Sequence, residues 1–346
     1  MASSVNNSAW VEWVTTLMGG VSRQAYAAML PPDRFYCLLD ELPLHLVPQR
    51  TLRSLRVRGD EELFLNPECV LLPASELPEG VACSKEVGAA FALRGTIAWV
   101  PDVATGELLP FWLGPQLEGL VRSVKPGEPV PSSFGAQARA VLRAPRILLP
   151  PGDDERIEQK WDRSAVRTAG EFRAKGYAPV ADLVHPFHIA ALRRYYRYLI
   201  RSGAIRLGDG QSPRRYVAYN EPVARFFHQH IAKKVSAVAG EVVKPSYVYF
   251  ASYLSGAELK KHTDRPQCEF SVTLCLDFSP EPRLETSWPI ELDNPSGTVK
   301  VYQALGDGLA YRGTRLPHYR GVLGEGKTST SVFFHYVAED FTGSLD

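Results

Sequence analysis

The sequence lacks the markers of disulfide-bonded, cysteine-zinc and membrane-spanning proteins. Its five cysteines are odd in number and scattered, with no C-x-x-C pair, so reduced thiols are expected rather than disulfides or a zinc site. No apolar run approaches the roughly 20 residues that a membrane-spanning helix needs, and no basic segment followed by an apolar one opens the chain. We therefore predict a cytoplasmic protein with no membrane partner.

The sequence also has no excess of positive over negative side chains. Lys and Arg number 39 against 38 Asp and Glu, so the formal net charge is only +1 and no nucleic-acid partner is predicted. The chain contains no internal repeat, no P-loop and no glycine-rich dinucleotide fingerprint. What is present, 45% hydrophobic and 22% charged residues in a chain of 346, is typical of a soluble globular protein with about two domains.

A segment rich in turn residues divides the chain. Residues 150–155 combine prolines, a glycine and acidic residues without apolar periodicity, which is typical of a linker. We predict a small α+β domain of unknown role over residues 1–150 and a second domain over residues 151–346. Only His45 of the eight histidines lies in the first part, so no metal centre is expected there. Its role is open between substrate recognition and a structural one, as a cover for the second domain or a dimer interface.

Apolar periodicity predicts the elements of both parts. In the first, helices are expected at residues 10–18, 23–29 and 116–124, and strands at 63–65, 69–72 and 96–100. In the second, helices are expected at 186–202 and 221–238, and the four arginines of the former are interpreted as its solvent-facing side. From residue 247 the period changes to two, with strands at 247–253, 270–276, 298–302, 308–311 and 330–337. Short strands separated by turns, with flanking helices, predict a double-sheet jelly roll.

Two histidines and an aspartate have the spacing of a metal site. His262 and Asp264 stand two apart at the end of a strand-like run, so on an extended strand both side chains leave the same face. His318 follows later, and two imidazoles with one carboxylate on one side of a divalent ion make the facial triad of non-heme Fe(II) oxygenases. His335 competes with His318 for the third position, but it lies among apolar residues, and we expect it to be structural.

A longer pattern around these residues resembles a known family. In one order along the chain stand Tyr253, Gly256, His262, Asp264, His318 and, nine residues later, Lys327. This order is similar to that of the 2-oxoglutarate- and Fe(II)-dependent dioxygenases, particularly their prolyl 4-hydroxylase-like branch. Residues 308–313 also resemble the family's strand that leads to the second histidine. The Gly-Gly-x-Thr segment common in that branch is absent, and residues 287–290 stand near its place, which leaves the substrate open.

The resemblance implies a fold, a set of cofactors and several residue roles. It implies a double-stranded β-helix that binds Fe(II) through the two histidines and the aspartate and takes 2-oxoglutarate and O2 as co-substrates. Lys327 would pair with the distal carboxylate of 2-oxoglutarate, and Tyr253 would hydrogen-bond that co-substrate. Arg320 is a rival to Lys327, because its spacing of two from His318 puts both side chains on one face of an extended segment.

We predict an oxygenase that hydroxylates an unactivated C–H bond of a peptide, amino-acid or natural-product substrate and releases succinate and CO2. Four side chains near the motif are candidates for contacting that substrate: Tyr249, Arg265, Trp288 and Arg315. Desaturation or cyclisation by the same core stays open, as does a non-catalytic, cupin-like module that binds metal for sensing or interaction. Whether the chain forms a homodimer is also open.

Overall fold

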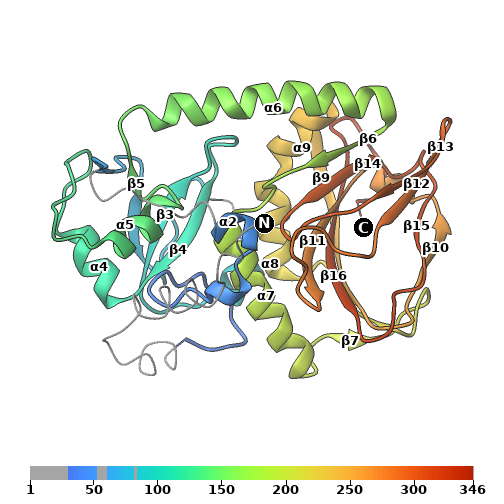
Figure 1. The fold of residues 1–346 in the computed structure, drawn as a ribbon, viewed down its shortest axis with the longest axis horizontal. Helices are drawn as coiled ribbons and strands as arrows, with labels where there is room; N and C mark the ends of the chain where they lie inside the picture. The colour runs from blue at the N-terminus through green and yellow to red at the C-terminus, as the bar shows by residue number, and fades with distance from the viewer. Residues whose placement is uncertain (1–29, 53–60, 82–83, 346) are drawn as a thin grey trace, which may run out of the picture.

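The computed structural model describes residues 30–52, 61–81 and 84–345, which form helices and four antiparallel sheets. This is a mixed architecture of helix and sheet, as the sequence predicts. The two helices expected at residues 10–18 and 23–29 lie outside the described residues. Figure 1 shows the N-terminal strands on one side of the molecule, the C-terminal strands on the other, and helices between them.

Two small sheets lie in the N-terminal part. The three-stranded sheet contains β2 (Val70–Pro73), β3 (Thr96–Pro101) and β4 (Leu108–Leu113), and the two-stranded sheet contains β1 (Phe64–Leu65) and β5 (Leu148–Leu149). The helical elements of this part are η2 (Leu44–Leu46), α2 (Gln49–Leu52), α3 (Lys85–Ala90), α4 (Pro115–Arg122) and α5 (Ala136–Arg143). The strands expected at 63–65, 69–72 and 96–100 and the helix expected at 116–124 are present, whereas β4 was not predicted.

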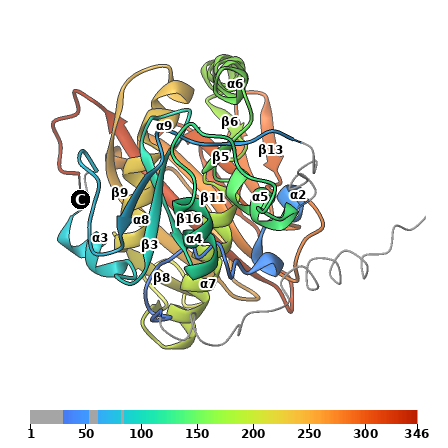
Figure 2. The same ribbon diagram turned by 90° about the vertical axis from the view of Figure 1, so that its left-hand side faces the viewer.

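Three helices form a layer between the N-terminal and C-terminal strands: α7 (Pro186–Arg201), α8 (Pro222–His230) and α9 (Ala232–Ala239). In Figure 2 the N-terminal side faces the viewer, with its strands in front of this layer. The single helix expected over residues 221–238 was wrong, because Ile231, at φ −90° and ψ 0°, separates α8 from α9. Within the described part of the chain, no helix combines the length and the apolar character needed to cross a membrane.

A fourth helix, α6 (Asp153–Lys175), runs along the top edge of the molecule in Figure 1 and is seen end-on at the top of Figure 2. It ends at Gly176, whose φ of 77° lies in the left-handed region that glycine adopts without strain. The backbone N–H of Gly176 donates to the Phe172 carbonyl at 2.8 Å, which closes the last turn. The chain then enters the sheet of the C-terminal part directly.

Two antiparallel sheets make up the C-terminal part. Their strands are β6 (Tyr177–Val180), β7 (Arg206–Leu207), β8 (Arg215–Tyr219), β9 (Val243–Tyr253), β10 (Leu259–His262), β11 (Phe270–Ser279), β12 (Ile290–Asn294), β13 (Gly297–Val301), β14 (Gly308–Arg312), β15 (His318–Arg320) and β16 (Thr328–Ala338). The larger sheet has the order β6-β14-β11-β16-β9-β8-β7 and the smaller β10-β15-β12-β13. The five strands expected from residue 247 onward are present, and β10 lies in the strand-like run that ends at His262 and Asp264, but β12 and β15 were not predicted as strands.

The two sheets meet through apolar side chains. Ile290 and Leu292 of β12 pack in one buried cluster with Leu309 and Tyr311 of β14, which belongs to the larger sheet. The smaller sheet therefore covers one face of the larger, and the helical layer covers the other. This arrangement of two facing antiparallel sheets is consistent with the predicted jelly roll.

One hydrophobic core runs from the N-terminal part into the larger sheet. Its buried residues come from both sides of the predicted linker at residues 150–155. The ring of Phe35 meets Tyr195 of α7 and Phe227 of α8 at centroid distances of 6.2 and 5.7 Å. On the other side of the layer, Tyr196 stacks on Phe250 of β9 at 4.2 Å. The helices are thus buried between N-terminal residues and the sheet.

The arginines of α7 do not all face solvent, so that interpretation was wrong. Arg193 is fully buried, and its guanidinium donates to Asp277 Oδ1 at 2.9 Å and to the Leu46 carbonyl at 2.6 Å. It also pairs with Glu281, and Arg197 donates to Asp277 from the next turn of the helix. The expectation failed because α7 lies between two layers, so its polar side meets carboxylates of the larger sheet and the loop after it.

We expect Arg193→Ala to lower the free energy of unfolding by about 3 kcal/mol. This is the low end of the effect of breaking a buried ion pair, because Asp277 keeps Arg197 as a partner. Chemical denaturation measures the change. The matched control is Arg201→Ala, an exposed position at the end of the same helix, which should alter stability by no more than about 0.5 kcal/mol. Equal losses in the two variants would contradict the role given to the buried arginine.

Candidate metal centre

Three side chains from the predicted motif converge beside the smaller sheet. His262 ends β10 and His318 begins β15, and the antiparallel register places the two directly opposite each other. Their ring centroids are 4.4 Å apart. Asp264 follows two residues after β10, and its Oδ1 lies 3.6 Å from His262 Nε2 and 3.5 Å from His318 Nε2. Strand pairing therefore brings together residues that are more than fifty positions apart.

The hydrogen bonds of the two imidazoles determine which nitrogen is free. His262 Nδ1 lies 2.8 Å from the Lys260 carbonyl, and His318 Nδ1 lies 3.0 Å from the Leu316 carbonyl. Because a carbonyl oxygen only accepts, each Nδ1 must carry the proton, and each Nε2 keeps a lone pair. Both lone-pair nitrogens are the atoms nearest to Asp264 Oδ1. Two neutral nitrogen donors thus face one carboxylate oxygen.

The charge states at this site suit a cation. Burial alone would raise the pKa of Asp264, but the hydrogen bond and charge of the His318 imidazole in its protonated form, with contributions from His335 and Ser271, bring it to about 2. In the neutral tautomer described above, a bound cation would take the place of that proton. Burial lowers the pKa of His262, and the neighbouring His318 lowers it further. Cis ligands about 2.1 Å from a common ion stand roughly 3 Å apart, and the distances here are little longer. The donor set fits a divalent transition metal bound from one side.

Arg320 places a buried guanidinium between the two sheets of the C-terminal part, near the triad. It stands two residues after His318 on β15 and is 4% exposed. Its Nη1 donates to the Trp288 carbonyl at 2.7 Å and its Nη2 to Gln303 Oε1 at 3.3 Å, while Nε has no hydrogen-bond partner among the described residues. The known acceptors are both neutral, so the guanidinium charge is not compensated by a carboxylate within the described chain. A buried charge in this situation is costly unless an anion joins it.

Lys327 lies in a different environment from the one that the sequence led us to expect. It immediately precedes β16 in a turn, and its Nζ donates to Ser287 Oγ at 2.8 Å in a contact exposed to solvent. The resemblance gave it the distal carboxylate of 2-oxoglutarate as a partner. Its ammonium instead meets a hydroxyl 40 residues away in sequence, a contact that no local pattern records.

Tyr253 is fully buried on β9, where its hydroxyl accepts a hydrogen bond from Arg215 Nη1 at 3.0 Å. Its ring packs edge-on against Trp288 at 5.0 Å, and Trp288 also lies under the Arg320 guanidinium. Sequence reasoning missed Arg215 and Gln303. Arg215 begins β8 directly opposite Tyr253 in the register, and the alternation of Arg215, Val217 and Tyr219 was the available signal.

The remaining candidate substrate residues are spread along the site. Tyr249 donates its hydroxyl to Asp209 at 2.5 Å, and the Arg265 guanidinium lies 5.1 Å from the Tyr247 ring centroid. Arg315 is exposed in the loop between β14 and β15. Of the four candidates, Trp288 contacts Arg320 and Tyr253, and Tyr249 packs against the same apolar cluster, so the structure brings both to the interior that the triad borders.

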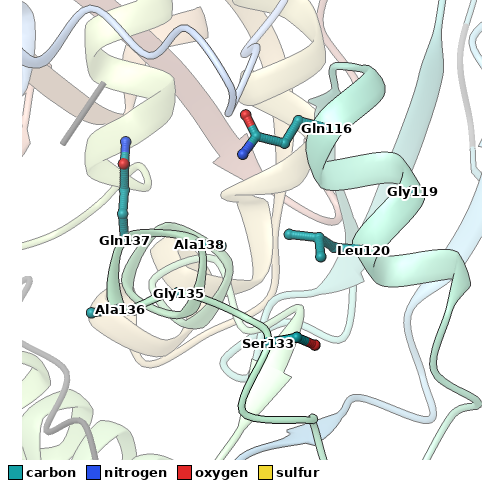
Figure 3. A pocket seen from close by; sticks show the side chains of 8 residues that line it. All are labelled: Gln116, Gly119, Leu120, Ser133, Gly135, Ala136, Gln137 and Ala138. Carbon is teal, nitrogen blue, oxygen red and sulfur yellow. The ribbon is translucent and has the colours of Figure 1, made fainter. Parts of the chain in front are cut away.

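A separate surface pocket of about 440 Å³ lies in the N-terminal part between α4 and α5. Figure 3 shows its lining, in which Gln116 and Leu120 of α4 face residues 135–138. The eight lining residues include no titratable side chain. The side chains that line this pocket therefore offer no titratable acid, base or metal ligand.

Comparison with known proteins finds neither a family model nor a curated protein that matches the chain. Solved structures with a similar fold do exist. The non-heme alpha-ketoglutarate-dependent epimerase SnoN from nogalamycin biosynthesis is 16% identical, with a TM-score of 0.43 over 51% of this chain and 83% of its own. A prolyl-4-hydroxylase from Pseudomonas putida is 15% identical, with a TM-score of 0.42 over 51% and 99%.

A third similar structure is a prolyl hydroxylase from Trichoplax adhaerens in complex with a peptide fragment of the hypoxia-inducible factor oxygen degradation domain. It is 14% identical, with a TM-score of 0.44 over 52% of this chain and 92% of its own. Identities and scores this low assign no activity to this chain. Its chemistry has to be inferred from its own residues.

Proposed function

We propose that the protein is an oxygenase that uses Fe(II), O2 and 2-oxoglutarate to hydroxylate an unactivated C–H bond, releasing succinate and CO2. One observation carries the proposal: His318 of the triad and the uncompensated buried cation Arg320 lie two residues apart on the same short strand. A 2-oxo acid with a second, distal carboxylate meets both features, since one end chelates a metal and the other needs a cation.

Arg320, rather than Lys327, is the partner that we propose for the distal carboxylate. Its guanidinium is buried on the strand of His318 and has a free N–H, whereas the Lys327 ammonium is already bonded to Ser287 near solvent. Gln303 and the Trp288 carbonyl hold the guanidinium in place through its other nitrogens. The site therefore presents a fixed donor without needing to rearrange.

The chain's own part in the reaction is to position groups and to exclude water. Iron(II), with a 2-oxo acid and O2, would supply the oxidising chemistry. The carbonyls of Lys260 and Leu316 keep both imidazoles in the tautomer that leaves Nε2 free. The buried side chains of Tyr253 and Trp288 line the interior between the two sheets. Because Asp264 takes the position that a halide ligand would need, the proposed reaction is hydroxylation and not halogenation.

We further propose that the facing sheets form a double-stranded β-helix within an oxygenase domain of residues 151–346. Residues 1–150 would then cover its helical layer, a role supported by the core that both parts share. The proposed substrate is a small molecule or a peptide that approaches from the side of His262. The side chain of His262 is 30% exposed, whereas that of His318 is 3% exposed.

His262→Ala, Asp264→Ala and His318→Ala should each weaken Fe(II) binding by more than about 100-fold, beyond the range typical of changes to outer partners of a metal site. Each should also stop succinate formation from 2-oxoglutarate, while the thermal unfolding temperature changes little. Anaerobic Fe(II) titration gives the affinity. The control is His45→Ala, which removes an exposed imidazole from the N-terminal part and should bind Fe(II) normally. Normal Fe(II) affinity in all three triad variants would reject the metal centre.

Arg320→Met should raise the concentration of 2-oxoglutarate needed for half-maximal turnover by roughly 100-fold, the equivalent of about 3 kcal/mol for an unpaired carboxylate. Lys327→Met, which removes the rival cation, should change it by less than about threefold. Fe(II) affinity should be similar in both variants. Arg320→Met should also unfold at a temperature no lower than the wild type without 2-oxoglutarate, because it removes an uncompensated buried charge. The reverse ranking of the two variants would move the carboxylate site to Lys327.

A further inference from the structure

We propose that Ser271, His335 and Gly313 form a cradle that fixes Asp264 with one carboxylate oxygen directed at the metal. This inference rests on the proposed function only in that the triad is taken to hold a metal ion. None of the three residues belongs to the triad, and His335 was expected to be purely structural. They are positioning residues, since each acts through Asp264.

Strand register assembles the cradle. Ser271 lies on β11, where it faces His335 of β16 on one side and Tyr311 of β14 on the other. Its Oγ is 2.8 Å from Asp264 Oδ2 and 2.9 Å from His335 Nδ1. Ser271 is 1% exposed and His335 6% exposed, so water does not compete freely for these bonds. The hydroxyl therefore links the carboxylate to the central strand of the larger sheet.

The protons available on Ser271 and His335 determine which atom donates in each of these hydrogen bonds. A serine hydroxyl has one proton, and an ionised carboxylate can only accept, so Ser271 donates to Asp264 Oδ2. His335 Nδ1 must then carry its own proton and donate to Ser271 Oγ. His335 thus donates to Ser271 Oγ, and Ser271 donates to Asp264 Oδ2, which leaves Oδ1 as the oxygen that faces the two Nε2 atoms. The cradle thus selects which oxygen is available as a ligand.

Gly313 supplies room and a backbone anchor. A Cβ at this position would lie 2.2 Å from Asp264 Oδ2, 2.5 Å from the Cys268 carbonyl and 2.7 Å from Ser271 Oγ, which are impossible contacts. The Gly313 carbonyl also accepts the backbone N–H of Asp264 at 2.9 Å. Only glycine allows the carboxylate to approach Ser271 in this way.

The same residues have a competing interpretation as a second metal site. Asp264, Cys268 and His335 offer ligand atoms that all lie within 4.8 Å of one another. The Ser271 hydroxyl, however, already bridges Asp264 and His335, and Cys268 Sγ is 2.9 Å from the Tyr247 hydroxyl. An ion there would have to displace the serine, so we interpret this group as the support of the triad.

The test compares Fe(II) affinity in variants of the cradle, measured by anaerobic titration of the full-length protein. Ser271→Ala should weaken Fe(II) binding by about 10–100-fold, as changes to outer partners of a metal site usually do. The control is Ser252→Ala, which removes another buried hydroxyl of the larger sheet, bonded to Thr330 at 2.8 Å. It should lose similar thermal stability and keep wild-type affinity.

Variants of His335 separate positioning from packing. His335→Asn keeps an N–H donor close to the place of Nδ1 and should retain most of the affinity, whereas His335→Leu should weaken it as Ser271→Ala does. The absorption spectrum of the Co(II)-loaded protein provides a second readout, because a reoriented carboxylate changes the ligand field. The backbone carbonyl of His335, which accepts from His228 and Ser246, is present in every variant.

Three results would overturn the cradle. These are wild-type Fe(II) affinity in Ser271→Ala, equal weakening in His335→Asn and His335→Leu, and metal binding in His262→Ala/His318→Ala that disappears with Cys268→Ser. The last would assign an ion to the second group. A wild-type protein that binds no Fe(II) rejects the proposed function instead, so the two failures are distinguishable.

Discussion

The proposed metal centre depends on the antiparallel pairing of β10 with β15. These strands contain four and three residues, yet their register puts one imidazole opposite the other at the edge of the smaller sheet. The carboxylate is positioned by a different contact. Asp264 follows β10, and its backbone N–H donates to the Gly313 carbonyl in the loop after β14. The site therefore requires β10 with Asp264, the loop after β14 and β15 to be placed correctly. All three are positioned relative to the larger sheet.

The interior of the C-terminal part has an uneven distribution of charge. A divalent ion held by a single carboxylate leaves positive charge at one end, and Arg320 adds positive charge at the other. A dianionic acid between the two would leave no net charge inside the sheets. One ligand with two negative charges would thus neutralise both the positive charge at the proposed metal and that of Arg320. A monocarboxylate would neutralise only one of these charges. This electrostatic complementarity supports the dianionic charge of the proposed co-substrate from the residues of this chain alone.

The sequence predicted α7, the strands β9, β11 and β16 and the residues of the triad, because these leave local signals. Period-two alternation marks the three strands, and the His-x-Asp pair ends a strand-like run. The 23-residue helix α6 was not predicted, and a strand as short as β15 contains too few residues to alternate detectably. The contacts of Arg320 and Lys327 come from Trp288, Gln303 and Ser287, which are distant in sequence, so no local pattern records them. Arg193 was misplaced for another reason: its burial depends on two layers that meet α7 from opposite sides, and no local pattern records that.

Helix α6 connects the N-terminal part with the loop that precedes β15. Its 23 residues make a rod about 35 Å long at 1.5 Å per residue. At its start Asp153 pairs with Arg146 of the N-terminal part at 3.2 Å, and at its end the Gly176 carbonyl accepts the Arg312 N–H at 2.9 Å. Leu316 packs against the same glycine, and its carbonyl fixes the imidazole of His318. The two ends of α6 thus contact the N-terminal part and, through Gly176, the loop whose Leu316 carbonyl fixes the His318 imidazole.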